Sequence, residues 1–106
     1  LGWTPGSLDS WNVLHNIIRC REDDGAGKFN LGNYCNPRIG VLTDMILSET
    51  DVAKRDAMIA EAYTTMHNER GYIPLHQQGL AWGVADKVNV VQRADNQFDI
   101  RHVTVE

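Results

Sequence analysis

The residues best suited to chemistry lie at the start of the chain, where Trp3, Asp9 and Trp11 flank a Pro-Gly turn. Pro5 and Gly6 favour a turn because proline presets φ at about −65° and glycine tolerates positive φ. Indole rings held on such a loop offer flat apolar area and one N–H donor, which suits contact with a small ligand. The same tryptophans also fit an ordinary core or lid role, and the residue types alone leave both interpretations open.

The two cysteines, Cys20 and Cys35, enclose a loop rich in Gly, Asp and Asn. A structural zinc site needs about four ligands, and the sequence has no CxxC or HxxxH spacing to supply them. In an oxidising compartment we expect a disulfide, which would contribute about 3 kcal/mol in the chain-entropy model. Two free buried thiols are the alternative in a reducing compartment.

Other residue types used in catalysis are present without the required grouping. The glycine-rich loop 21–34 lacks the Gly-Lys-Ser/Thr ending of a phosphate-binding loop, and Asp23 and Asp24 would repel phosphate. No serine or cysteine has the surroundings of a nucleophile elbow. No pair of histidines has metal-ligand spacing; they are His15, His67, His76 and His102. We therefore expect a solvated loop at 21–34, and no enzyme activity, metal or cofactor.

Length and charge narrow the class of protein. With 106 residues the chain forms one domain at most. A formal net charge of −4 and scattered basic residues argue against a nucleic-acid partner, which requires a basic stripe. No apolar run approaches the roughly 18 residues of a membrane-spanning helix.

Apolar spacing and cap residues predict two helices in the first half of the chain. The first covers residues 9–19, with Asp9 or Ser10 as its N-cap. The second begins at Asn36-Pro37, where the asparagine caps and the missing N–H of proline costs nothing.

A third helix is predicted from Thr50 or Asp51 to about Asn68. Asp51 and Arg55 are four residues apart, so we expect an ion pair between them that adds a few tenths of a kcal/mol. Gly71 supplies the expected helix stop. The apolar stripe of this helix consists of Met58, Ile59, Ala62, Tyr63 and Met66.

The pattern changes after Gly71, and short strands are predicted at 72–76, 79–84, 88–91 and 98–105. Pro74 restricts the first of these to a sheet edge or a strand end. A turn at 94–96 precedes the last strand. Helices followed by strands indicate an α+β fold class.

Four stretches, taken in order, resemble the C-terminal part of extracellular solute-binding protein family 5, the dipeptide- and oligopeptide-binding components of ABC importers. The resemblance implies the C-terminal part of a two-lobed periplasmic-binding-protein type II fold, within a parent chain several times longer. Residues 1–70 would belong to the helical part of the second lobe, and 71–106 would be strands returning toward the first. The stretches are Gly2-Trp3-Thr4 leading to Asp9, Asn33-Tyr34-Cys35-Asn36-Pro37, Glu49-Thr50-Asp51 with Lys54-Arg55, and Tyr72-Ile73-Pro74-Leu75-His76.

The function implied by this resemblance is capture of a peptide or other small solute in the periplasm, or outside the cell at the membrane. Delivery to an inner-membrane ABC permease would follow. The resemblance also favours the disulfide between Cys20 and Cys35, since some relatives carry one there. The implied ligand-binding residues are Trp3, Thr4, Asp9 and Trp11.

One position departs from the peptide-binding pattern. In peptide-binding members of the family, an aspartate three residues after the first tryptophan holds the α-amino group by a charge-assisted hydrogen bond. Here that position is Gly6. We therefore expect either a different solute or a substitute role for Asp9.

Two other function classes remain open. The apolar segments of 72–84 are compatible with a free-standing, non-catalytic interaction domain that self-associates, for example as a homodimer. An enzyme or metal protein is the third hypothesis, and it rests only on scattered His and Asp residues.

Overall fold

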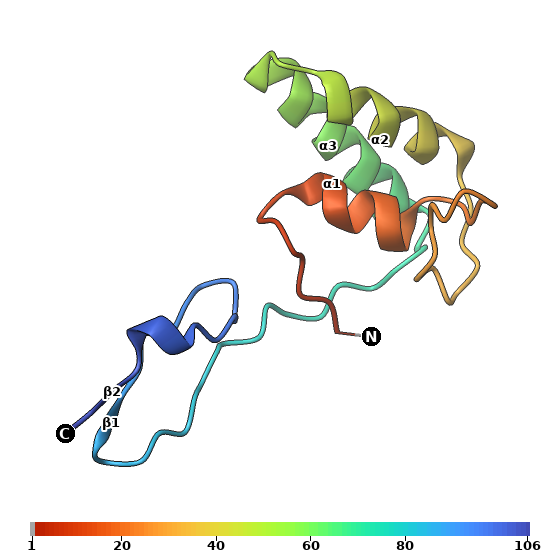
Figure 1. Cartoon of the computed structure of the whole chain (residues 1–106). Helices are drawn as coiled ribbons and strands as arrows, with labels where there is room; N and C mark the ends of the chain where they lie inside the picture. Colours follow the sequence, from red (N-terminus) through yellow and green to blue (C-terminus); the bar gives the residue numbers. More distant parts are fainter. Residues whose placement is uncertain (1) are drawn as a thin grey trace.

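The computed structural model describes residues 2–106, which form a helical body (residues 2–72) and an extended arm (residues 73–106) (Figure 1). The molecule measures 55 × 31 × 26 Å, and its radius of gyration is 17.5 Å. A compact chain of this length has a radius of gyration of about 13 Å. The arm, which extends away from the body, accounts for the difference.

The body starts with helix α1 (Ser10–Val13), which continues directly into the π-helical turn η1 (Leu14–Ile18). Asp9 is the N-cap, and its carboxylate accepts the N–H of Trp11 at 2.8 Å. The predicted helix over 9–19 is thus confirmed. Its second half is wider than an α-helix, and Arg19 N–H donates to Leu14 O at the end of this turn.

Helices α2 (Pro37–Ser48) and α3 (Val52–Asn68) pack against each other beside α1 (Figure 1). Both begin at predicted caps, because the Asn36 side chain accepts the N–H of Arg38 and the Asp51 side chain accepts the N–H of Lys54. The predicted Asp51–Arg55 ion pair is wrong. Asp51 serves the helix start, while Arg55 binds Asp9.

Helix α3 ends in a Schellman motif. Arg70 N–H donates to His67 O, Gly71 N–H donates to Met66 O, and Arg70 has φ 55°. The left-handed residue is therefore Arg70, whereas the sequence indicated Gly71. Glycine is required at 71 for another reason, since a Cβ there would lie 2.7 Å from the Tyr34 ring.

The core lies where α1, η1, α2 and α3 meet. The predicted stripe of α3 is confirmed, because Ala62 and Met66 are buried in the core, and the other three members of the stripe pack against it. Tyr34 and Tyr72 also pack against its edge. The buried members are Leu14, Ile17, Ile18, Ile39, Leu42, Ile46, Ala62 and Met66.

The loop 21–34 is closed by a disulfide between Cys20 and Cys35, with the two Cα atoms 4.4 Å apart. It contains turns but no helix or strand, as predicted. The loop is less solvated than expected, because Ala26 and Asn30 are buried. The Asn30 amide donates to Arg19 O at 2.9 Å and to Tyr34 O at 2.6 Å, so it joins the two ends of the loop.

The arm carries one two-stranded antiparallel sheet, formed by β1 (Val88–Asn89) and β2 (Thr104–Val105) with the 3₁₀ turn η2 (Ile100–His102) between them. The strands predicted at 72–76 and 79–84 are absent from the described chain, and those at 88–91 and 98–105 shrink to two residues each. The predicted turn at 94–96 is confirmed. The structure is a mixed helix and short-strand fold, compatible with α+β.

Candidate functional site

Trp3 is held against the body by both its ring and its N–H group. Its Nε1–H donates to Asn12 Oδ1 at 2.9 Å, and its ring centroid lies 4.9 Å from that of Phe29. The indole also packs against the core, which leaves it half-buried. Its one hydrogen-bond donor is already used within the chain, so Trp3 offers a ligand apolar ring surface only.

Trp11 forms a second aromatic surface in α1. Its ring stacks on His15, one turn further along, with centroids 4.6 Å apart and an angle of 16° between the planes. Both rings are half-buried, while Thr4 is exposed. The four residues named for ligand binding therefore combine two partly accessible indoles, an exposed hydroxyl and the carboxylate of Asp9.

Asp9 is bound on both oxygens. Arg55 Nη2 lies 2.8 Å from Oδ1 and 2.8 Å from Oδ2, and Oδ1 also accepts the N–H of Trp11. The hydrogen bond from Arg55 first, and that from Trp11 second, hold the pKa of Asp9 below its ordinary value. The carboxylate is ionised at neutral pH, and its charge is already balanced by a guanidinium.

Arg55 is itself fixed by the body, since its Nε donates to Ile46 O at 3.1 Å. Its pairing with Asp9 joins α3 to the start of α1. Sequence reasoning missed this contact, because the two residues are 46 positions apart and a nearer acidic neighbour, Asp51, was present.

A buried charge lies at Arg19, which is only 6% exposed. Its Nη1 donates to Asp44 at 2.8 Å and its Nη2 to Glu22 at 2.9 Å. Gly40 packs beside the guanidinium, because a Cβ at that position would be 3.6 Å from Nη2. The ion pairs of this cluster connect η1, the disulfide loop and α2, and we assign them a structural role.

The junction between body and arm is held by two tyrosines. The Tyr34 hydroxyl donates to Glu69 at 2.6 Å, and burial followed by this carboxylate raises the pKa of Tyr34 to about 12. The Tyr72 hydroxyl lies 2.8 Å from Asn30 Oδ1 and 3.0 Å from Ile17 O. Tyr72, the last residue before the arm, is therefore bound both to η1 and to the disulfide loop.

The arm contains an open apolar groove of about 450 Å³. Trp82 is fixed on its wall, since Nε1–H donates to Asn96 Oδ1 at 2.8 Å and its ring lies 6.0 Å from that of Phe98. The groove is lined by Trp82, Gly83, Val84, Ala85, Val88, Val90, Phe98 and Val103.

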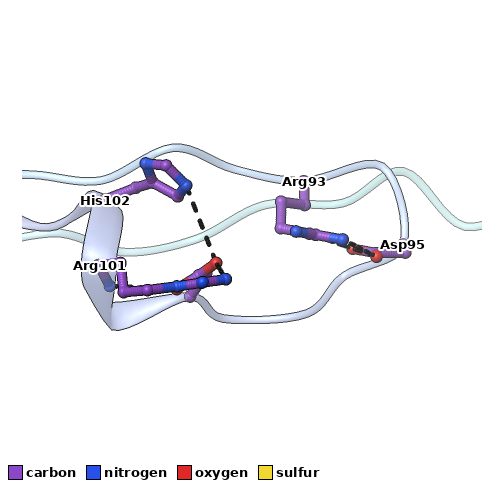
Figure 2. Close-up of polar contacts among 5 residues, drawn as sticks. Arg93, Asp95, Arg101 and His102 are labelled. Atoms are coloured by element: carbon purple, nitrogen blue, oxygen red, sulfur yellow. Dashed lines mark hydrogen bonds and ion pairs between the residues drawn. The ribbon is translucent and has the colours of Figure 1, made fainter.

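Charged residues near the groove pair locally. Arg93 binds Asp95 at 2.6 Å, and Arg101 binds Asp99 at 2.7 Å with His102 Nε2 3.8 Å from the same carboxylate (Figure 2). The Arg93 hydrogen bond lowers the pKa of Asp95 to about 2. Within residues 2–106, no three or more His, Cys, Asp and Glu side chains are grouped to hold a metal ion.

No family model, curated protein or solved structure matches this chain. None of the helices between residues 2 and 106 is long and apolar enough to cross a membrane.

Proposed function

We propose that this chain is the C-terminal part of a family-5 type solute-binding protein, which captures a small solute between two lobes and delivers it to an ABC permease. The observation that carries the proposal is the division between a helical body with its own core and an apolar arm without a core. An arm of this kind suits a segment whose strands are completed by another lobe of a type II binding fold. The disulfide is compatible with an oxidising compartment such as the periplasm.

The first residues of the chain would form one wall of the solute site. Trp3 and Trp11 contribute aromatic surface, and Thr4 contributes an exposed hydroxyl. Asp9 is neutralised by Arg55, and Gly6 carries no side chain to hold an amine. This wall therefore favours an uncharged or apolar part of the solute over a free α-amino group.

Capture by such a protein depends on differential affinity. A solute that touches both lobes only in the closed state shifts the population toward closure. The body alone supplies one wall of the cleft, so most of the contact area and water exclusion of a tight site would be missing. We expect weak solute binding by the 106-residue chain and strong binding by the two-lobed parent.

The test is the size and compartment of the natural gene product. Antibodies raised against this chain should detect, in osmotic-shock extracts of the source cells, a protein several times heavier than 11.9 kDa. That parent should also gain thermal stability with one member of a panel of peptides, sugars, amines and metal chelates. A natural product of the chain's own mass would overturn the proposal.

The second candidate function is a free-standing, non-catalytic interaction domain. It is favoured by the exposed apolar side chains of the arm, among them Ile73, Leu75 and Ile100. The same immunoblot separates the two candidates, because an interaction domain would be found at the mass of this chain.

A further inference from the structure

The chain exposes far more surface than a compact protein of its mass. Its accessible surface is 7828 Å², whereas a compact monomer of this mass exposes about 6,000 Å². The excess is more than twice the roughly 800 Å² that each partner contributes to a stable interface of standard size. There is therefore enough uncovered surface for a stable dimer.

The exposed segment 71–85 lacks the charges that usually protect a strand edge from pairing with another chain. From Gly71 to Ala85 the sequence contains no Asp, Glu, Lys or Arg. Leu75 is 85% exposed, and Leu80 and Val84 are 42% and 43% exposed. Edges of this kind pair with another chain unless charge, proline or a covering element prevents it.

The backbone of the same segment is unpaired. In the described part of the chain, residues 72–84 make no backbone–backbone hydrogen bond with one another or with any other element. Pro74 lacks an N–H group and obstructs ladder formation in the first half of the segment. The second half, residues 79–84, has an N–H group and a C=O group at every position.

We propose that residues 80–84 pair antiparallel with the same residues of a second copy of this chain, around a two-fold axis at Trp82. Alternate side chains of an extended segment share a face, so Leu80, Trp82 and Val84 lie together. A two-fold axis at Trp82 places Leu80 opposite the partner's Val84. Such an isologous interface is self-complementary in apolar side chains.

The groove supports the same geometry. Trp82 and Val84 line it, and Asn96 holds the Trp82 indole in place. Pairing at 80–84 places the grooves of the two copies side by side on one face of the paired strands. The proposal concerns the 106-residue chain and does not depend on the transport proposal.

The test is sedimentation equilibrium of the full chain over a range of concentrations, with two charge variants. Wild-type chain is expected to show a monomer–dimer equilibrium. Leu80→Lys and Val84→Glu should each raise the dimer dissociation constant at least about tenfold, because each places two unpaired charges opposite apolar side chains. An equimolar mixture of the two variants should recover a heterodimer, since Lys at 80 then faces Glu at 84 of the partner.

Leu75→Lys is the matched control. It adds a charge to the same uncharged run, outside the paired residues, and should leave the dimer intact. Far-UV circular dichroism checks that the helices of the body persist in every variant. A monomeric wild-type chain, a mixture without heterodimer, or equal losses in Leu75→Lys and Leu80→Lys would each overturn the proposal.

Discussion

The body and the arm contain similar kinds of apolar residue but use them differently. The body buries Leu14, Ile39, Leu42 and Ile46 completely, while no described residue beyond Met66 is buried. A helix satisfies its backbone hydrogen bonds within its own segment, so α2 and α3 need neighbours only to bury their apolar faces. A strand needs a partner, and the arm supplies only two residues on each side. Apolar content alone therefore does not create a core.

The ion pairs show the same difference. In the body, Arg55 pairs with Asp9 and Arg19 with Asp44, residues far apart in sequence, although Arg19 also binds Glu22 three positions away. In the arm, Arg93 binds Asp95 and Arg101 binds Asp99, each two positions away. Pairs of the first kind resist separation of elements, whereas pairs of the second kind fix a turn.

Amide hydrogen exchange should give the largest difference between the two regions. We expect exchange at residues 72–84 to stay within about tenfold of a free peptide, while core amides of α2 and α3 exchange at least about a thousandfold more slowly. The measurement is exchange followed by NMR at a low concentration, where the chain is monomeric. Protection at 79–84 that persists at such a concentration would contradict the comparison.

The second-largest difference is expected when apolar side chains of the body and of the arm are truncated. Leu42→Ala removes a fully buried side chain and should lower the free energy of unfolding by about 2–5 kcal/mol. Ile100→Ala removes a side chain that is 76% exposed and should change it by less than about 0.5 kcal/mol. Urea unfolding followed by helical circular dichroism measures both. Equal losses would show that Ile100 contributes to the stability of the body, which would contradict the comparison.

Loss of the disulfide should destabilise the body by about 3 kcal/mol, because it closes a loop with a sequence separation of 15. The variant is Cys20→Ser with Cys35→Ser, and urea unfolding measures the loss. Fluorescence of a variant with Trp82 as its sole tryptophan serves as the control, since the arm contains no cysteine. A change in that emission equal to the change in the body would show that arm and body unfold together.

The last prediction concerns the contribution of Asp9 to the free energy of unfolding. Two variants distinguish its role as N-cap from its ion pair with Arg55. Asp9→Asn keeps an N-cap side chain but removes the ion pair with Arg55, so it should cost about 0.5–1 kcal/mol. Asp9→Ala removes both and should cost about 1 kcal/mol more. Thermal unfolding at pH 7 compares the two variants.

The same pair predicts a dependence on pH. Arg55 lowers the pKa of Asp9 below its ordinary 3.8, so its contribution is complete above pH 3.8 and is lost as pH falls through the lowered pKa. Asp9→Asn should lack this part of the acid sensitivity. Identical acid profiles for Asp9→Asn and wild type would contradict the role of the pair.

Local signals made the helices of the body predictable. Asn36 is predictable as a cap, and Asp51 as one of two candidates with Thr50, because a short polar side chain before an apolar stripe meets the free amides of the first turn. The strands were predicted from the same kind of local pattern, and they failed because strand formation depends on a partner outside the segment. Apolar alternation at 79–84 indicates that this segment is able to pair as a strand. Only the structure shows that no other described segment of the chain pairs with it.

Sequence reasoning proposes the members of the candidate site, but it does not provide their contacts. Trp3 and Asp9 were chosen for residue type and position in a turn. Their partners Asn12, Phe29 and Arg55 follow from how the first loop packs on the helices, which no local pattern encodes. The disulfide pairing agrees with the expectation drawn from the family resemblance.

The attachment of Tyr72 determines which parts of the body a pull on the arm would reach. Tyr72 is the last residue of the body before the arm, and its backbone continues directly into Gly71 and the end of α3. Its hydroxyl adds a second attachment, 2.8 Å from Asn30 Oδ1 and 3.0 Å from Ile17 O. Asn30 lies in the loop that Cys20 and Cys35 close, so the Tyr72 hydroxyl links the start of the arm to a cross-linked loop. A pull on the arm would therefore be shared between the end of α3 and a loop that a covalent bond holds closed.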